Sequence, residues 1–247
     1  MRWLATLLIL FLAGPAAMAT PSRDAILIYS GTTGYRHDSI PAGIQAITAI
    51  AERRGLAVVA SEDPAMFSAR NLKRFRAIVL LSTTTDPKNP ASEWLVGDRR
   101  AALRQFVRRG GGILAVHAAA DSHYHWPWYG RLIGARFARH PPGTPTGTVS
   151  LTAPTHSVNQ GMPLRIRRTD EWYYFDDYDP TSTLLVTLDP TSIGEAGHAN
   201  PVTWTRKVDG GRVFYTAMGH TTESYSEPFF LRQLGNGLDW MIRGESN

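Results

Sequence analysis

The segment Phe106-Val-Arg-Arg-Gly-Gly-Gly-Ile-Leu-Ala-Val-His117-Ala-Ala-Ala-Asp121 decides the fold of this chain. Its two arginines suit the C-terminal end of a helix, and the three glycines that follow can end one. Residues 113–116 are all apolar, which is typical of a central parallel strand covered on both faces. His117 is therefore expected at the carboxyl end of a strand, where open α/β sheets bind ligands. The alternative is a buried histidine that is hydrogen-bonded to a neighbouring loop.

Strands and helices are predicted to alternate before this segment. Apolar runs predict strands at residues 25–30, 57–61 and 77–82, and helical spacing predicts helices from Pro41 to Gly55 and over residues 93–109. This alternation favours a mostly parallel sheet with right-handed crossovers. Additional β segments are expected in the C-terminal half, at residues 149–153, 165–168 and 183–188 and in a hairpin formed by residues 202–206 and 212–216. A final amphipathic helix is predicted to begin at Pro228.

The first nineteen residues have the pattern of a secretory signal peptide. Arg2 supplies the positive charge, residues 4–11 the apolar region, and Ala17-Met-Ala19 a small-residue cleavage site. Cleavage is predicted after Ala19, which implies a periplasmic or secreted protein without stable membrane insertion. Residues 20–247 are expected to form a single domain, because this length fits one α/β domain.

The composition excludes several classes of function. The chain contains no cysteine, so it has neither disulfides nor a thiol nucleophile. Its formal net charge is only +5, and its arginines form no basic stripe interleaved with aromatic residues, so nucleic acid is not an expected partner. The charged run at residues 165–168 is predicted to be a solvated strand face.

Histidines recur at predicted strand ends. His37 follows the first strand and His220 follows the last, so both should meet His117 at one edge of the sheet. Each histidine could instead have a structural role, such as entry into a helix for His37. Between Trp126 and His140 the chain is rich in aromatic residues, which could form either core or a platform for sugar rings.

Several motifs together resemble the trehalose-utilisation (ThuA-like) family. They are Gly-Tyr-Arg-His37, Gly-Gly-Gly-Ile-Leu-Ala-Val-His117-Ala, Gly-Ala-Arg-Phe-Ala-Arg-His140-Pro, Asp-Glu171-Trp-Tyr, Pro-Val-Thr-Trp204-Thr-Arg and Gly-Arg-Val-Phe-Tyr-Thr-Ala-Met-Gly-His220. The resemblance implies a flavodoxin-like three-layer α/β sandwich of the class I glutamine amidotransferase type. The place of His117 resembles the one at which those relatives carry a cysteine nucleophile. Because this chain has no cysteine, glutamine hydrolysis through a thioester is excluded. The family pattern has His-Pro where this chain has His156-Ser157, which makes His156 a weaker candidate.

The resemblance implies a small carbohydrate ligand, related to trehalose or an oxidised sugar. His117, Glu171 and His220 are then the expected catalytic residues. The expected substrate-binding residues are Tyr35, His37, Trp128, His140 and Trp172. Histidine titrates near neutral pH, so proton transfer in a hydrolase or lyase reaction is available to this set. A divalent metal such as zinc is compatible with it and would polarise a carbonyl or activate water.

The sequence leaves three interpretations of this histidine-rich set open. One is an enzyme of the kind just described. A second is a non-catalytic sugar-binding module, and a third is a structural domain with incidental histidines. Oligomeric state is not predicted.

Overall fold

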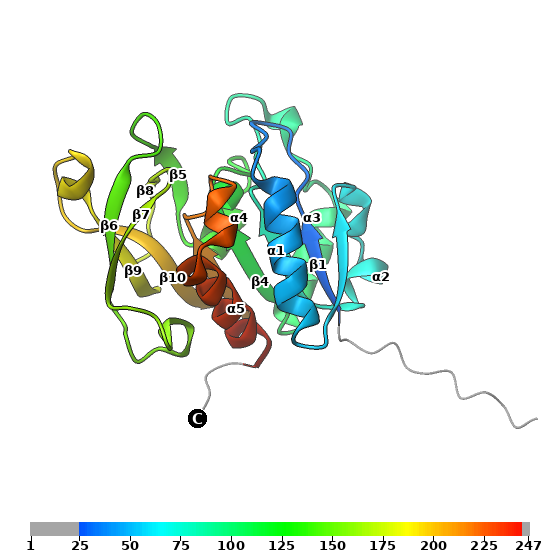
Figure 1. The fold of residues 1–247 in the computed structure, drawn as a ribbon. Coiled ribbons are helices and arrows are strands. Elements are labelled where there is room, and N and C mark those ends of the chain that lie inside the picture. Colours follow the sequence, from blue (N-terminus) through cyan, green and yellow to red (C-terminus); the bar gives the residue numbers. More distant parts are fainter. Residues whose placement is uncertain (1–24, 244–247) are drawn as a thin grey trace, which may run out of the picture.

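The structure, a computed structural model, describes residues 25–243 and contains a nine-stranded sheet (Figure 1). Five parallel strands are β1 (Ala25–Tyr29), β2 (Ala57–Ser61), β3 (Phe75–Leu81), β4 (Gly112–Val116) and β11 (Gly211–Thr216). The antiparallel extension comprises β6 (Thr146–Leu151), β7 (Arg165–Thr169), β9 (Thr183–Asp189) and β10 (Asn200–Val208). The strand order is β2-β1-β3-β4-β11-β10-β9-β6-β7. Two further strands, β5 (Arg136–Arg139) and β8 (Tyr174–Asp176), pair separately.

Strand β4 occupies the centre of the parallel part of the sheet. It pairs in parallel with β3 on one side and β11 on the other, so that Ala115 lies between Leu80 and Tyr215. All five residues of β4 are buried, which explains its unbroken apolar sequence. The prediction that residues 113–116 form a central parallel strand ending at His117 is confirmed.

Helices cover both faces of the sheet. Helices α1 (Ile40–Glu52) and α5 (Pro228–Arg243) lie side by side over one face (Figure 1). Helix α3 (Asp98–Arg108) connects β3 to β4 in the direction opposite to the β1–α1–β2 connection, so right-handed crossovers place it on the other face. The short helices α2 (Ala69–Leu72) and α4 (Pro127–Ile133) complete the set. The parallel strands follow the flavodoxin-like order, and the predicted three-layer sandwich is confirmed.

The boundaries of several elements differ from the prediction. The helix expected over residues 93–109 begins only at Asp98, because Gly97 has a φ of 52° and does not continue a helix backward. The preceding segment turns inward instead, and Trp94 packs against Tyr29 with ring centroids 4.4 Å apart. The predicted hairpin is confirmed, with Val208 paired to Gly211 across its turn.

The described residues bear on membrane-spanning helices but not on the predicted signal peptide. Within residues 25–243, none of the helices combines the length and apolar character needed to cross a membrane. The predicted signal peptide and its cleavage site lie outside the described residues, so secretion stays a prediction.

Candidate functional site

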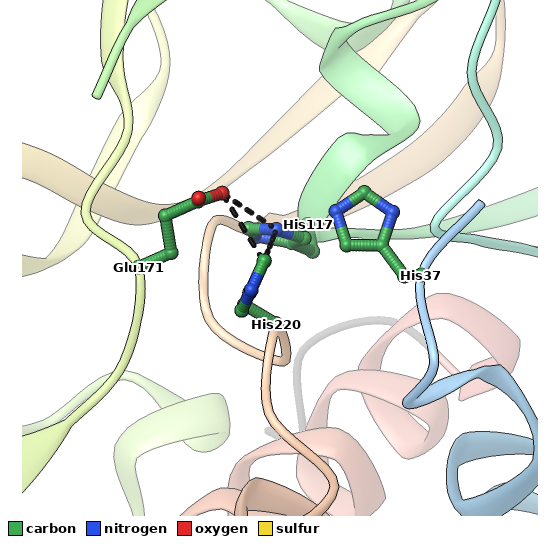
Figure 2. Close-up of side chains that lie close together, drawn as sticks. All are labelled: His37, His117, Glu171 and His220. Atoms are coloured by element: carbon green, nitrogen blue, oxygen red, sulfur yellow. Dashed lines mark hydrogen bonds and ion pairs between the residues drawn. The ribbon is translucent and has the colours of Figure 1, made fainter. Parts of the chain in front are cut away.

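Loops at the carboxyl edge of the sheet bring four predicted site residues together. His37 follows β1, His117 directly follows β4, and His220 follows β11, while Glu171 comes from the loop after β7. One potential ligand atom from each of these side chains lies within 4.8 Å of those of the others. Figure 2 shows Glu171, His117 and His220 meeting at a point, with the ring of His37 beside them. The convergence expected from the strand-end positions is therefore present.

His117 is held firmly at the base of this cluster. It is fully buried and has a φ of 50°, a left-handed conformation that places a sharp bend directly after β4. Its Nδ1 lies 2.6 Å from the carbonyl oxygen of Ala217, and its own carbonyl accepts a hydrogen bond of 2.9 Å from Tyr215 Oη. Because a carbonyl oxygen can only accept, Nδ1 carries the proton and Nε2 faces the cluster.

Three polar atoms form a nearly equilateral triangle at the centre of the cluster. His117 Nε2 lies 3.2 Å from His220 Nδ1 and 3.4 Å from Glu171 Oε2, and the last two atoms are 3.2 Å apart (Figure 2). The other carboxylate oxygen, Oε1, lies 3.2 Å from Nδ1 of His140. Glu171 thus connects the buried His117 and the half-buried His220 to the more exposed His140.

The environment sets the protonation of the cluster. Burial raises the pKa of Glu171, but its interactions with the neighbouring His117 and His220 outweigh burial and hold this pKa well below its usual range. The hydrogen bond with Glu171 raises the pKa of His220. Burial, reinforced by the neighbouring histidines, lowers the pKa of His37 from 6.5 to about 2. Glu171 is consequently ionised and His37 neutral at neutral pH.

A buried ion pair positions the loop that carries His220. Asp170 accepts hydrogen bonds from the backbone N–H groups of Gly219 (2.9 Å) and His220 (3.0 Å). Its Oδ2 lies 3.1 Å from Nη1 of Arg168, whose Nε donates to Glu227 at 2.8 Å. The prediction that residues 165–168 form a solvated face is wrong for Arg168, whose side chain is only 1% exposed. Its guanidinium turns inward because the carboxylate of Asp170 needs a counter-charge in the core.

A cavity of about 420 Å³ opens above the cluster. Its lining residues are Tyr35, His37, Asp121, Phe137, His140, Glu171, Tyr173 and His220. The ring of Tyr173 packs against His117 with centroids 4.3 Å apart, while Tyr35 is 64% exposed at the opening. Aromatic walls with a few convergent polar groups are typical of small-molecule sites.

Sequence reasoning missed Asp121, the second carboxyl group in this cavity. Burial raises its pKa from 3.8 to about 6, although a hydrogen bond donated by Tyr124 Oη opposes the change. The sequence signal that could have identified Asp121 is its position just after the strand-end histidine and three alanines. Tyr173 was also missed, because nothing in the sequence separates it from its aromatic neighbours.

Two tryptophans expected to bind substrate lie elsewhere. Trp172 is fully buried and donates from Nε1 to the carbonyl of Pro145 at 2.8 Å. Trp128 is stacked on Trp126, and its Nε1 donates to Asp209 at 2.9 Å. Neither ring lines the cavity. Trp172 and its neighbour Tyr173 face different ways along the chain, so Trp172 packs in the core and Tyr173 lines the cavity. Trp128 packs in the core against Trp126.

Two histidines just before the aromatic segment, His123 and His125, also lie away from the cavity. His123 is buried against Trp94 and Tyr129, with ring centroids 4.4 and 4.8 Å apart. His125 contacts the carbonyl of Pro87 through Nε2 at 3.1 Å.

The fold and the site together define a class of protein. The parallel core has the glutamine amidotransferase-like arrangement, but a histidine stands at the end of β4 and no thiol is present in the sequence. The profile of the trehalose utilisation (ThuA) family matches residues 25–241, and the chain belongs to this family.

Solved structures agree with this assignment. A protein from Bacteroides uniformis described as ThuA-like is 20% identical, with a TM-score of 0.72 and coverage of 94% of this chain and 97% of that one. A ThuA-like protein from Parabacteroides merdae is also 20% identical, with a TM-score of 0.72 and coverage of 90% and 91%. A Thermoplasma acidophilum protein described as part of a GMP synthase is 12% identical, with a TM-score of 0.52 and coverage of 87% and 95%. These likenesses establish the fold alone, and no curated protein matches the chain.

Proposed function

We propose that this protein is a periplasmic or secreted carbohydrate-processing enzyme that acts on a trehalose-related or oxidised sugar. One observation carries the proposal: a buried histidine–glutamate cluster opens into a cavity walled by aromatic rings. Its volume of about 420 Å³ lies within the range of small-molecule sites. The rings of Tyr35, Phe137 and Tyr173 supply apolar faces for a sugar ring, and the histidines supply partners for its hydroxyl groups.

The two carboxyl groups of the cavity are suited to different tasks. Glu171 stays ionised because its histidine partners stabilise the negative charge. Asp121 has a pKa of about 6 and exchanges protons near neutral pH. Two carboxyl groups whose environments move their pKa values in opposite directions are typical of acid–base pairs in enzymes. We therefore assign proton transfer to Asp121 and stabilisation of positive charge to Glu171, in a hydrolase or lyase reaction.

The location in the periplasm or outside the cell rests on the N-terminal sequence. Arg2, the apolar stretch of residues 4–11 and the small residues before Thr20 support cleavage by a signal peptidase. A chain without cysteine also has no thiol that an oxidising compartment would modify.

Turnover of sugars by the purified protein tests the proposal. The protein would be incubated with trehalose, related disaccharides and their oxidised forms, and the products followed by NMR. We expect at least one of these sugars to be converted, and Asp121→Asn to lower kcat about 10²–10⁴-fold, as for loss of a general acid or base. Glu52→Gln, a change at the exposed end of α1, is the matched control. Wild-type kcat in Asp121→Asn would refute the role of Asp121.

A non-catalytic sugar-binding module is the second candidate. The close contacts of Glu171 with His140 and His220 favour it, because these polar side chains could position hydroxyl groups without further chemistry. Calorimetric binding of a disaccharide with no product in the NMR assay would select this function over the enzyme.

A further inference from the structure

The spacing of the central polar atoms matches a metal site. Zinc binds histidine nitrogen and carboxylate oxygen at about 2.0–2.1 Å, so two ligands of a tetrahedral ion are about 3.3–3.4 Å apart. The three distances among His117 Nε2, His220 Nδ1 and Glu171 Oε2 are 3.2, 3.4 and 3.2 Å. These atoms thus have the separation of three ligands that share one face of a coordination tetrahedron. We propose that His117, His220, Glu171 and His37 bind one divalent transition-metal ion of the zinc type.

The protonation of His117 suits this role. Its Nδ1–H is directed to the carbonyl of Ala217 at 2.6 Å, which leaves the lone pair of Nε2 for the centre of the cluster. Metal-binding histidines almost always donate their second ring N–H to a carbonyl, carboxylate or water in this way. The ring of His117 is also confined by Tyr173 and by the bend after β4. The ligand atom is therefore preoriented before any ion binds.

His220 and His37 complete the set from two other loops. Asp170 anchors the backbone of His220, so the ring projects from a loop held by buried hydrogen bonds. His37 is only 3% exposed, and its ring centroid lies 4.8 Å from that of His117 and 5.1 Å from that of His220. Figure 2 shows this ring next to the triangle formed by the other three side chains.

The three central atoms can all direct lone pairs to one ion. Nδ1 of His117 is engaged with the carbonyl of Ala217, so Nε2 is the nitrogen that faces Glu171 Oε2 and His220 Nδ1. The carboxylate oxygen and an unprotonated Nδ1 of His220 each offer a further lone pair at 3.2 Å from one another. A divalent cation satisfies all three lone pairs at once. Its binding releases the Nδ1 proton of His220 to solvent, since only the unprotonated nitrogen coordinates.

The donor set selects the class of ion. Three imidazole nitrogens and one carboxylate oxygen suit zinc, cobalt, nickel, copper or ferrous iron, whereas calcium and magnesium prefer oxygen ligands. The cluster borders the cavity through His37, Glu171 and His220, so an oxygen of a bound sugar could reach the ion. The role of the ion in catalysis rests on the proposed function, but metal binding itself is measured without a sugar.

Metal titration of the purified protein tests the inference. The protein is stripped with a chelator and titrated with Co²⁺, whose visible absorption reports tetrahedral nitrogen and oxygen ligands, and with Zn²⁺ by calorimetry. We expect one ion per chain and a rise in Tm on binding. Glu171→Gln and His220→Ala should each weaken binding by more than about 100-fold, the upper limit typical of outer-shell partners. His125→Ala, which removes a histidine outside the cluster, should bind as the wild type does.

The results separate this inference from the proposed function. Failure of the wild type to bind Co²⁺ or Zn²⁺, or unchanged affinity in both ligand variants, would overturn the metal site. Comparison of Tm and circular dichroism with the metal-free wild type shows whether His220→Ala still folds. His220→Asn is the second variant if His220→Ala does not. Metal binding without sugar turnover would support the metal site and refute the proposed enzyme activity. Sugar turnover by a protein that binds no metal would support the enzyme activity and refute the metal site.

Discussion

The substitution Asp121→Asn should make the protein more stable at neutral pH and leave it nearly unchanged in acid. Burial raises the pKa of Asp121 from 3.8 to about 6, so the folded state binds a proton more tightly than the unfolded state does. Below about pH 3 the carboxyl is protonated in both states. As the pH rises towards 6, only the unfolded state loses the proton, and stability falls. Above about pH 6 the folded protein contains a poorly solvated carboxylate.

The size of the effect follows from the shift. A change of about two pKa units corresponds to about 3 kcal/mol of unfolding free energy at 1.36 kcal/mol per unit. Asparagine has the same shape as aspartate, and its carbonyl oxygen can still accept the hydrogen bond from Tyr124 Oη. Asp121→Asn should therefore gain up to about 3 kcal/mol near pH 8, and this gain should shrink to near zero below about pH 3.

Urea denaturation of metal-free protein at several pH values between about 3 and 8 measures the effect. The relevant quantity is the difference in unfolding free energy between Asp121→Asn and the wild type at each pH, which removes the contributions of all other titrating groups. Glu52→Gln provides the control, and its curve should run parallel to that of the wild type. A constant difference between Asp121→Asn and the wild type would show that the carboxyl of Asp121 is not perturbed.

Three further predictions concern the loop anchor, the tryptophans and the N-terminus. Asp170→Asn should lower the unfolding free energy by about 2–3 kcal/mol. This is less than the roughly 3–5 kcal/mol typical of a broken buried ion pair, because Arg168 keeps its bond to Glu227. Urea denaturation measures the change, and an unfolding free energy equal to that of the wild type would contradict the prediction. Trp128→Phe should leave sugar affinity within about twofold by calorimetry, since the ring lies outside the cavity, and a larger loss would place it at the site. Intact-mass analysis of protein expressed with its natural N-terminus should find a chain that begins at Thr20, whereas only uncleaved chain would exclude the signal peptide.

Local sequence was sufficient where one physical effect dominates. A strand buried on both faces must be apolar throughout, so residues 113–116 could be recognised as a central strand from their composition. Because parallel strands end at the same edge, the positions of His37, His117 and His220 after their strands predicted that they would meet. The absence of cysteine excluded a thiol reaction without any structure. Glu171 and His140 were expected at the site only through the family resemblance.

Tertiary structure decided every property that depends on which way a side chain faces and what surrounds it. Trp172 and Tyr173 are adjacent aromatic residues, yet one fills the core and the other walls the cavity. Arg168 lies in a charged run but turns inward, because the buried carboxylate of Asp170 attracts it across the fold. Asp121 gains its raised pKa from burial among groups distant in sequence. Sequence patterns thus determined which segments form the sheet edge, whereas packing between distant segments determined which of its side chains face the cavity and carry charge there.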